Sequence, residues 1–274
     1  FHMWAPDVYE GAPYPVTAYL AIGSKAAAFA LILRLVAEGF APAADRWEQW
    51  QLVLAVLAGL TMLAGNLVAL AQKNLKRLLA YSSIGHAGFI LAGITAFSLE
   101  SDLASNGVMF YLVGYSITNV VVFAAVISFI NMTSREEIAD LGGLAANQPF
   151  LAACLGMGLF SLAGLPIFAG FTMKFYLFTA VASEGFLWLA GLAIFSSLVS
   201  LYYYFQVLRH VYIESTPPGQ SGGDLVEENP ALSRSPSFPI VVVLASGAGA
   251  MIWLGIYPRP LIDIIQAASK AVMG

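Results

Sequence analysis

FSLAGLPIFAGFTMKFYLFTAV, residues 160–181, decides the fold of this chain. The stretch is apolar almost throughout, but Gly164, Pro166 and Gly170 interrupt it. Proline and glycine disrupt helix interiors, and the apolar run is too long for one straight membrane span. We therefore predict a discontinuous transmembrane helix. Backbone groups freed by such a break are tolerated at membrane depth only where they face protein or a wet cavity.

The rest of the chain has the composition of a membrane protein. Hydrophobic residues make up 59% of its 274 residues and charged residues only 10%, which lies far outside the range of soluble domains. Long segments without Asp, Glu, Lys or Arg recur, each able to hold a helix of about 20 residues. The predicted fold class is all-α, a polytopic transmembrane helix bundle with one broken helix near 164–170. About seven spans are predicted, at 16–37, 50–71, 76–98, 107–131, 149–181, 186–209 and 237–257.

The remaining segments are expected at the two membrane faces. Three prolines predict that residues 1–15 form a loop entering the membrane. Residues 210–236 are rich in Pro, Gly and Ser and predict an exposed linker. Residues 237–274 are expected to form a C-terminal transmembrane helix followed by a tail. The basic cluster at 73–77 predicts that its end of the bundle faces the cytoplasm.

Two lysines lie where lysine is most costly. Lys25 is in the middle of VTAYLAIGSKAAAFALILRLV, and Lys174 follows the predicted break in GFTMKFY. A charged side chain at the bilayer centre costs roughly 2.5–3.5 kcal/mol on insertion scales, so intramembrane lysines usually mark a function. A buried amine can carry protons, because burial weakens its hold on the proton and a nearby carboxylate strengthens it. We predict that both lysines transfer protons instead of reaching the lipid headgroups.

Histidines provide two more candidates. His86, in YSSIGHAGFILAGI, is halfway into the third predicted span, where an imidazole can relay protons because its ordinary pKa is about 6.5. The alternative for His86 is a hydrogen-bonded packing role. His2 lies before the Pro6 break and is a further candidate relay. The predicted proton-relay residues are therefore Lys25, Lys174, His86 and His2.

Other polar residues within the spans allow two interpretations. Asn66 can bind water along a path or form hydrogen bonds between helices. Tyr202, Tyr203 and Tyr204 are expected to pack and to anchor the sixth span, because consecutive residues point to different faces of a helix.

Several classes of function lack support in the sequence. No nucleotide-binding, CxxC or HExxH motif is present, so neither a bound cofactor nor a metal is expected in this chain. Cys154 is the only cysteine and is expected to be a packed thiol. The net charge of -4 is small, and no nucleic-acid partner is expected.

Three stretches resemble the antiporter-like membrane subunits of respiratory complex I, and the similarity covers nearly the whole chain. They are FHMWAPDVYEGAPYPVTAYLAIGSKAAAFALILRL, QKNLKRLLAYSSIGHAGFILAGI and SLAGLPIFAGFTMKFYLF. Within this family, DVYEGAP followed by SKAA, together with the lysine in GFTMKFY, is similar to the subunit N (subunit 2) group.

The resemblance implies a fold of fourteen helices with two inverted five-helix repeats. Residues 16–37 would then be the last helix of the first repeat, and residues 50–209 would form the second. The resemblance places Lys25 and His86 on a central hydrophilic axis and Lys174 on the broken helix near an exit half-channel. It places His2 at the end of the family's helix seven, just before the helix that carries Lys25. The glutamate and lysine of the entry half-channel would precede Phe1, so we interpret the chain as a piece of a longer protein.

The function implied by the resemblance is that of a non-redox, proton-translocating subunit of NADH-quinone oxidoreductase. The complex as a whole uses NADH, FMN, iron–sulfur clusters and quinone, all held by other subunits. Expected partners are the other membrane-arm subunits and the lipid bilayer of a bacterial plasma membrane, or of an organellar inner membrane. Two alternatives stay open, namely a subunit of a multi-subunit Na⁺/H⁺ antiporter and a non-conducting structural subunit.

Overall fold

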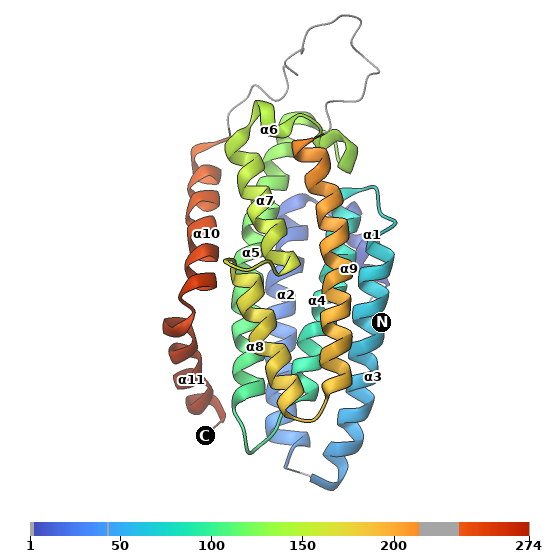
Figure 1. Cartoon of the computed structure of the whole chain (residues 1–274), viewed down its shortest axis with the longest axis vertical. Coiled ribbons are helices and arrows are strands. Elements are labelled where there is room, and N and C mark those ends of the chain that lie inside the picture. Colours follow the sequence, from blue (N-terminus) through green and yellow to red (C-terminus); the bar gives the residue numbers. More distant parts are fainter. Residues whose placement is uncertain (1–2, 43, 214–235, 274) are drawn as a thin grey trace, which may run out of the picture.

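The computed structural model describes residues 3–42, 44–213 and 236–273, and these residues form a bundle of helices (Figure 1). Within these ranges, six helices are long and apolar enough to cross a membrane. They are α2 (Tyr14–Leu35), α3 (Ala44–Ala69), α4 (Leu75–Thr95), α5 (Leu103–Thr133), α9 (Leu187–Tyr212) and α10 (Phe238–Ile256).

The seventh crossing is made of two short helices. The helices α7 (Pro149–Ala163) and α8 (Ala169–Ser183) follow one another along the bundle, with a turn between them at mid-height (Figure 1). The predicted all-α bundle and its broken helix are therefore confirmed. Three shorter elements connect these helices: the π-helix Val36–Phe40, the 3-10 helix Ile138–Leu141 and α6 (Leu144–Asn147).

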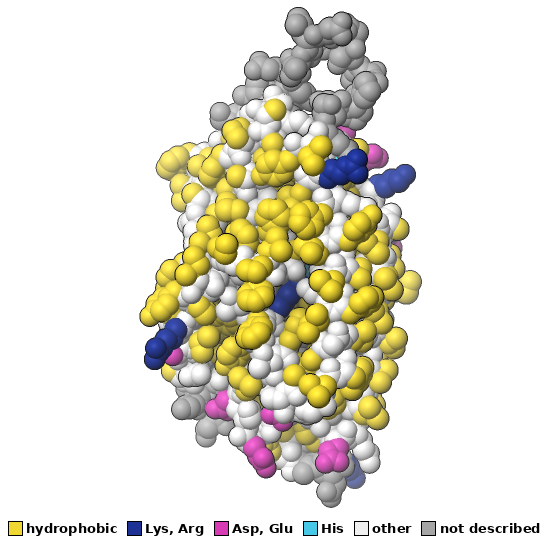
Figure 2. Space-filling view, viewed as in Figure 1, with side chains coloured by type: hydrophobic (Ala, Val, Ile, Leu, Met, Phe, Trp, Pro, Cys, Tyr) yellow, Lys and Arg dark blue, Asp and Glu magenta, His cyan; other side chains and the backbone are white. Residues whose placement is uncertain are grey.

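The bundle surface matches a hydrocarbon environment. Large apolar side chains such as Leu60 and Leu198 are exposed on the outside of the bundle, at 60% and 61%. Figure 2 shows hydrophobic side chains over the middle of the visible face, with Asp and Glu side chains gathered at its lower end. An apolar band bounded by charged ends is the surface that a membrane selects.

The centre of the bundle is α4. In its most apolar window 83% of the residues are buried, whereas the corresponding figure for α2 is only 17%. The helix begins after Asn74, whose side chain accepts a hydrogen bond from the backbone N–H of Arg77 and so caps the first turn. Side chains of α4 therefore meet the other helices, while α2 lies at the edge of the described bundle.

Residues 1–15 were expected to be a loop, and this is wrong for most of the described part. They contain the helix α1 (Trp4–Gly11), and α2 then begins at Tyr14. Pro6 lies in the first turn of α1 and Pro15 in the first turn of α2. The first backbone N–H groups of a helix have no partner within it, so proline is tolerated there and marks a helix start.

The C-terminal part also differs from the expectation. The segment expected to be a tail forms the helix α11 (Arg259–Met273), which follows α10 after a break at Tyr257 and Pro258. Residues 214–235, within the expected linker 210–236, lie outside the described residues, and α9 continues through Tyr212.

Candidate functional site

Lys25 turns its amine toward the centre of the bundle. The Nζ atom donates hydrogen bonds to the backbone carbonyl and the Oγ of Ser83 on α4, and lies 3.4 Å from the hydroxyl of Tyr115 on α5. It is also 5.3 Å from the centroid of the Tyr115 ring. The side chain is half-buried. Lys25 thus binds neutral groups inside the protein.

Hydroxyl groups surround the Lys25 amine. The Tyr115 hydroxyl donates to Ser83 Oγ at 3.1 Å, and the hydroxyl of Tyr9 on α1 lies 3.3 Å from the same atom. All of these oxygens can accept a proton or donate one. The helix α1 therefore contributes to the site, although the sequence suggested a loop there.

His86 lies one turn further along α4 and is 1% exposed. Its Nδ1 is 2.6 Å from the hydroxyl of Tyr111, and its ring centroid is 5.0 Å from that of Tyr115 and 5.7 Å from that of Phe89. The other ring nitrogen, Nε2, is buried and has no hydrogen-bond partner among the described residues. An imidazole bonded through one nitrogen keeps the second for proton exchange.

Lys174 is held by the end of α7. Its Nζ donates hydrogen bonds to the carbonyl oxygens of Leu162 at 2.8 Å and Ala163 at 3.1 Å, and to Ser197 Oγ on α9 at 2.9 Å. The side chain is 4% exposed. The last carbonyls of a helix have no partner within it and carry partial negative charge, so they suit a cation. The break therefore supplies the ligands of the amine.

Glycine is required on both sides of the break. Gly164 follows α7 with φ +88°, in the left-handed region that glycine adopts without strain. Gly170 lies in the first turn of α8, and its N–H donates to Ser161 Oγ at 3.1 Å. A Cβ atom at Gly170 would lie 1.5 Å from the carbonyl oxygen of Ser161. Pro166 lies in the turn between them.

The last span, α10, contacts the same break from outside. The hydroxyl of Thr172 donates to the carbonyl oxygen of Gly255 at 3.1 Å. The backbone at Gly255 also approaches Ile167 so closely that a Cβ there would lie 2.0 Å from the Ile167 carbonyl oxygen. The turn between α7 and α8 is thus packed against the end of α10.

Three of the four predicted relay residues, Lys25, His86 and Lys174, are linked by aromatic rings that lie between them. We call these three residues the lysine array. The Tyr115 ring contacts both Lys25 and His86, and the Phe89 ring contacts His86 and lies 5.3 Å from the Nζ of Lys174. Neither lysine forms an ion pair within the described chain. The fourth candidate, His2, lies outside the described residues.

Residues 1–200 match the family model described as NADH:quinone oxidoreductase/Mrp antiporter, TM. The chain belongs to this family. It is 42% identical over 273 residues to NADH-quinone oxidoreductase subunit N of Desulforamulus reducens, a match that covers 100% of this chain and 53% of the relative. The chain spans about half the length of the curated relatives it matches.

Solved structures agree with this assignment to the antiporter family. A chain of respiratory complex I from Thermus thermophilus is 32% identical with a TM-score of 0.74, covering 96% of this chain and 54% of that one. A chain of the Mrp complex from Dietzia sp. DQ12-45-1b has a TM-score of 0.83 at 21% identity, covering 100% and 58%. The second match shows the fold alone. The fold is therefore that of the antiporter-like membrane subunits.

A second buried lysine besides Lys174, among the described residues, was missed by sequence reasoning as a candidate site. Lys76 is 4% exposed, and its Nζ donates to the carbonyl of Glu10 at 3.0 Å. The Nζ also lies 3.4 Å from Glu136 Oε1 and 3.8 Å from the ring centroid of Tyr14, whose hydroxyl donates to Glu136. The cluster joins α1, α2 and the segment before Ile138 to the start of α4. The burial of Lys76 depends on partners that are distant in sequence, so the local sequence does not show it.

Glu136 is the titratable member of this cluster outside the membrane spans. Burial alone would raise the pKa of its carboxyl, but hydrogen bonds from Tyr14 and Asn74 and the charge of Lys76 together lower the pKa below its ordinary value. A lowered pKa in the folded state stabilises the fold above the ordinary glutamate pKa of about 4.3, and this contribution is lost as the pH falls through the lowered pKa.

We expect Lys76→Met to destabilise the full-length subunit by about 2 kcal/mol at pH 7, because the substitution leaves Glu136 without its cation and the carbonyls of Glu10 and Ala12 without this donor. The difference between Lys76→Met and the native chain should shrink as the pH is lowered below about 4. Thermal unfolding of the assembled complex measures both effects. Lys73→Met, at an exposed neighbouring position, is the control. An equal loss at pH 7 and at low pH would show that the ion pair does not contribute.

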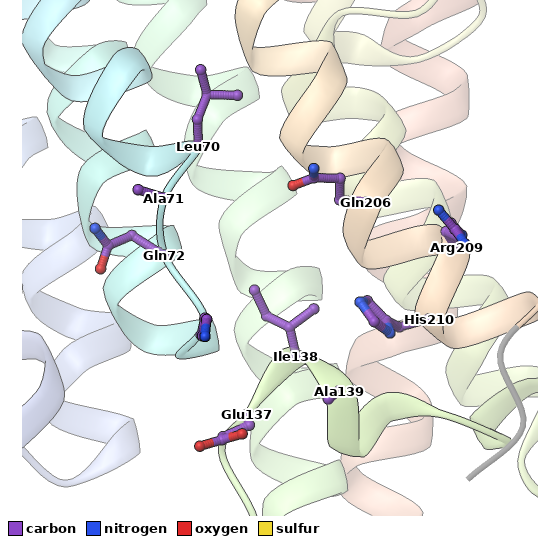
Figure 3. Close-up of a pocket in the computed structure, with 10 residues that line it drawn as sticks. Leu70, Ala71, Gln72, Glu137, Ile138, Ala139, Gln206, Arg209 and His210 are labelled. Carbon is purple, nitrogen blue, oxygen red and sulfur yellow. The ribbon is translucent and has the colours of Figure 1, made fainter. Parts of the chain in front are cut away.

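Two of the cavities on the described bundle bear on the candidate site. One, of about 540 Å³, lies at the end of the bundle between the turn after α3, the start of the Ile138–Leu141 helix and the last turn of α9 (Figure 3). Its lining includes Lys73, Glu137, Arg209 and His210, and neither Lys25 nor Lys174 is part of that lining. The other, of about 710 Å³, is apolar, lies between α8 and α9, and has Lys174 and Ser197 in its lining. The second cavity therefore belongs to the site of Lys174.

Proposed function

We propose that the chain is part of a proton-translocating subunit of NADH-quinone oxidoreductase, similar to subunit N, in a bacterial plasma membrane. The observation that carries this proposal is the inward orientation of two lysine amines, with a histidine between them and no carboxylate bonded to either within the described residues. The likeness to subunit N over the whole chain supports the same complex.

Proton transfer follows from the ligands of the two amines. Lys25 and Lys174 bind carbonyl and hydroxyl oxygens, which stabilise an ammonium but carry no full charge. Each amine can therefore lose its proton without leaving an unpaired carboxylate in the bilayer. A change of charge at one amine alters the proton affinity of the next, which is how a signal can pass along the array.

The redox chemistry belongs to other subunits in this proposal. Oxidation of NADH by quinone supplies the energy, and this chain contributes the membrane path for protons along Lys25, His86, Lys174 and water. The cofactors of the complex, NADH, FMN, iron–sulfur clusters and quinone, are assigned to those subunits. The other membrane-arm subunits and the lipid are the proposed partners.

The test of this proposal is Lys25→Arg in the full-length subunit within the intact complex. Arginine keeps the positive charge and its hydrogen bonds but does not release its proton in proteins. We expect NADH-driven proton pumping into membrane vesicles to fall about ten-fold while the complex still assembles. A lysine with a purely structural role would tolerate arginine, so full pumping by the variant would refute a relay at this position.

The two alternatives have less support. A structural subunit would be expected to pair its membrane lysines with acids, whereas here both amines bind neutral oxygens in the described part of the chain. The family model covers both NADH:quinone oxidoreductase and Mrp antiporter subunits and does not separate the two, whereas the relative at 42% identity favours the oxidoreductase over a Na⁺/H⁺ antiporter subunit. Vesicles loaded with sodium distinguish it, because an antiporter would generate a pH change without NADH.

A further inference from the structure

A second group of buried polar side chains lies beside α4, where α4 meets α3 and α9. The Tyr204 hydroxyl is hydrogen-bonded to Ser82 Oγ, and the Tyr203 hydroxyl donates to Asn66 Oδ1 at 2.8 Å. Asn66 in turn donates to Ser196 Oγ at 2.7 Å. All five side chains are at most 2% exposed. We call this group, Ser82, Tyr204, Tyr203, Asn66 and Ser196, the α9 hydroxyl cluster.

Packing alone does not account for this cluster. A polar group in hydrocarbon must be hydrogen-bonded, and bonds between membrane helices are worth only about 0.6–2 kcal/mol each. Phenylalanine at 203 and 204 would fill the same space without needing partners. The two tyrosine rings lie 4.5 Å apart, and the Tyr203 hydroxyl interacts with those of Tyr204 and Ser82 and with Ser200. The hydroxyls thus form a continuous line instead of isolated pairs.

The line of hydroxyls ends next to both membrane lysines. At one end, Ser82 is the neighbour of Ser83, whose oxygens bind the Lys25 amine. At the other end, Ser200 donates to the carbonyl of Ser197 at 2.6 Å. The Ser197 hydroxyl itself accepts from Lys174 at 2.9 Å. Ser197 and Ser200 are three residues apart on a helix, about 5–6 Å between Cβ atoms, a gap that one water can bridge.

The direct array through His86 is less polar. Aromatic ring faces separate His86 from both lysines, and its only hydrogen bond in the described chain is to Tyr111. Protons on this array depend on water for every step. The α9 hydroxyl cluster, by contrast, places hydroxyl oxygens between the two lysines, so water is needed only between Ser83 and Ser82 and between Ser200 and Ser197.

We propose that the α9 hydroxyl cluster is a second proton path between Lys25 and Lys174, parallel to the array through His86. This inference rests on the proposed function of the chain. The Lys25 ammonium gives its proton to Ser83 Oγ, to which it is already bonded, and becomes a neutral amine, and water carries a proton on from Ser83 to Ser82. Each hydroxyl accepts one proton and passes on its own, and the Lys174 amine becomes the ammonium. No tyrosine needs to ionise, and the hydroxyls rotate back before the next transfer.

Asn66 has a positioning role in this path. Its carbonyl oxygen accepts the hydrogen of Tyr203, and its amide is held by Ser196 and by the carbonyl of Met62 at 3.0 Å. In this arrangement the Tyr203 hydrogen points to Asn66 and not along the line toward Ser200. Proton transfer through Tyr203 therefore requires the bond between its hydroxyl and Asn66 Oδ1 to break, so Asn66 slows transfer along the second path.

A double-mutant cycle tests parallel paths. Tyr204→Phe and His86→Leu are introduced singly and together into the full-length subunit, and NADH-driven proton pumping by the intact complex is measured in vesicles. Phenylalanine removes only the hydroxyl oxygen of Tyr204. If each path substitutes for the other, each single variant keeps most of its pumping, and the double variant loses roughly ten-fold more than the product of the single losses. His86→Gln replaces His86→Leu if the leucine variant does not assemble.

The controls separate this inference from the proposed function. Tyr202→Phe, at the neighbouring tyrosine that is 61% exposed, should pump like the native complex. The second path would be refuted if the double variant pumps as fast as the slower of the two single variants. It would also be refuted if the loss of pumping in the double variant equals the product of the two single losses. Lys174→Ala is measured alongside. If it lowers pumping while the double-mutant cycle shows no synergy, only the second path fails. If it has no effect, the proposed function fails as well.

Discussion

Replacing Gly170 with valine is expected to prevent the helix break from forming. The new Cβ would lie 1.5 Å from the carbonyl oxygen of Ser161, and the atom in its way is backbone, so no side-chain rotation relieves the clash. The N–H of Gly170 would also lose its bond to Ser161 Oγ. We expect a destabilisation of about 4 kcal/mol or more, which is the range in which single substitutions abolish folding.

The amount of assembled complex in the membrane and its thermal unfolding measure the effect of Gly170→Val. Gly249→Val is the matched control, because Gly249 lies in the span α10 and nothing comes within 4 Å of an added Cβ. The control should assemble normally. Normal assembly of Gly170→Val would mean that α7 and α8 do not approach each other as closely as described.

Lys174→Ala is expected to stop proton pumping while the complex remains assembled. The substitution removes the charge and the exchangeable proton together, so both the relay and its effect on Lys25 are lost. General acid–base groups contribute about 100-fold or more to the steps that they serve, and we expect a loss of pumping of this order. Coupled quinone reduction should fall with it. The carbonyls of Leu162 and Ala163 lose a donor, at a cost of about 1–3 kcal/mol each unless water replaces the amine.

Proton pumping in vesicles and the rate of quinone reduction are the measurements for Lys174→Ala. Thr179→Ala, on an exposed turn of the same helix α8, controls for a general effect of substitution on that helix. Pumping at the native level by Lys174→Ala, in a complex confirmed to carry the variant, would remove Lys174 from the mechanism.

The sequence predicted the features whose energetic cost depends on a residue and its neighbours in the chain. Glycine and proline in an apolar run forced a break, and Gly164 ends α7 as expected. The lysines at 25 and 174 stood out because a charge deep in an apolar segment is costly wherever it points. Proline position was misread in residues 1–15. A proline ends one helix and starts another with equal ease, and only the path of the chain shows which occurs.

The partners of these residues could not be predicted, because they come from distant helices. Lys25 bonds to Ser83 and Lys174 to Ser197, and no local pattern connects these pairs. Tyr202 points outward while Tyr203 and Tyr204 are buried, as three consecutive helical positions require. Their hydrogen bonds, however, depend on which polar groups α3 and α4 present to them. A packing role was therefore the only one that the sequence supported.

The contact between Gly255 and the turn after α7 limits how this protein can be shortened. The last span supplies no member of the lysine array, so a truncation before it looks harmless for transport. Truncation would remove the acceptor of the Thr172 hydroxyl and uncover the Ile167 carbonyl, which now lies against the backbone of Gly255. The deletion would thus affect residues far from it in sequence, because the turn between α7 and α8, which positions the carbonyl ligands of Lys174, would lose its packing against α10.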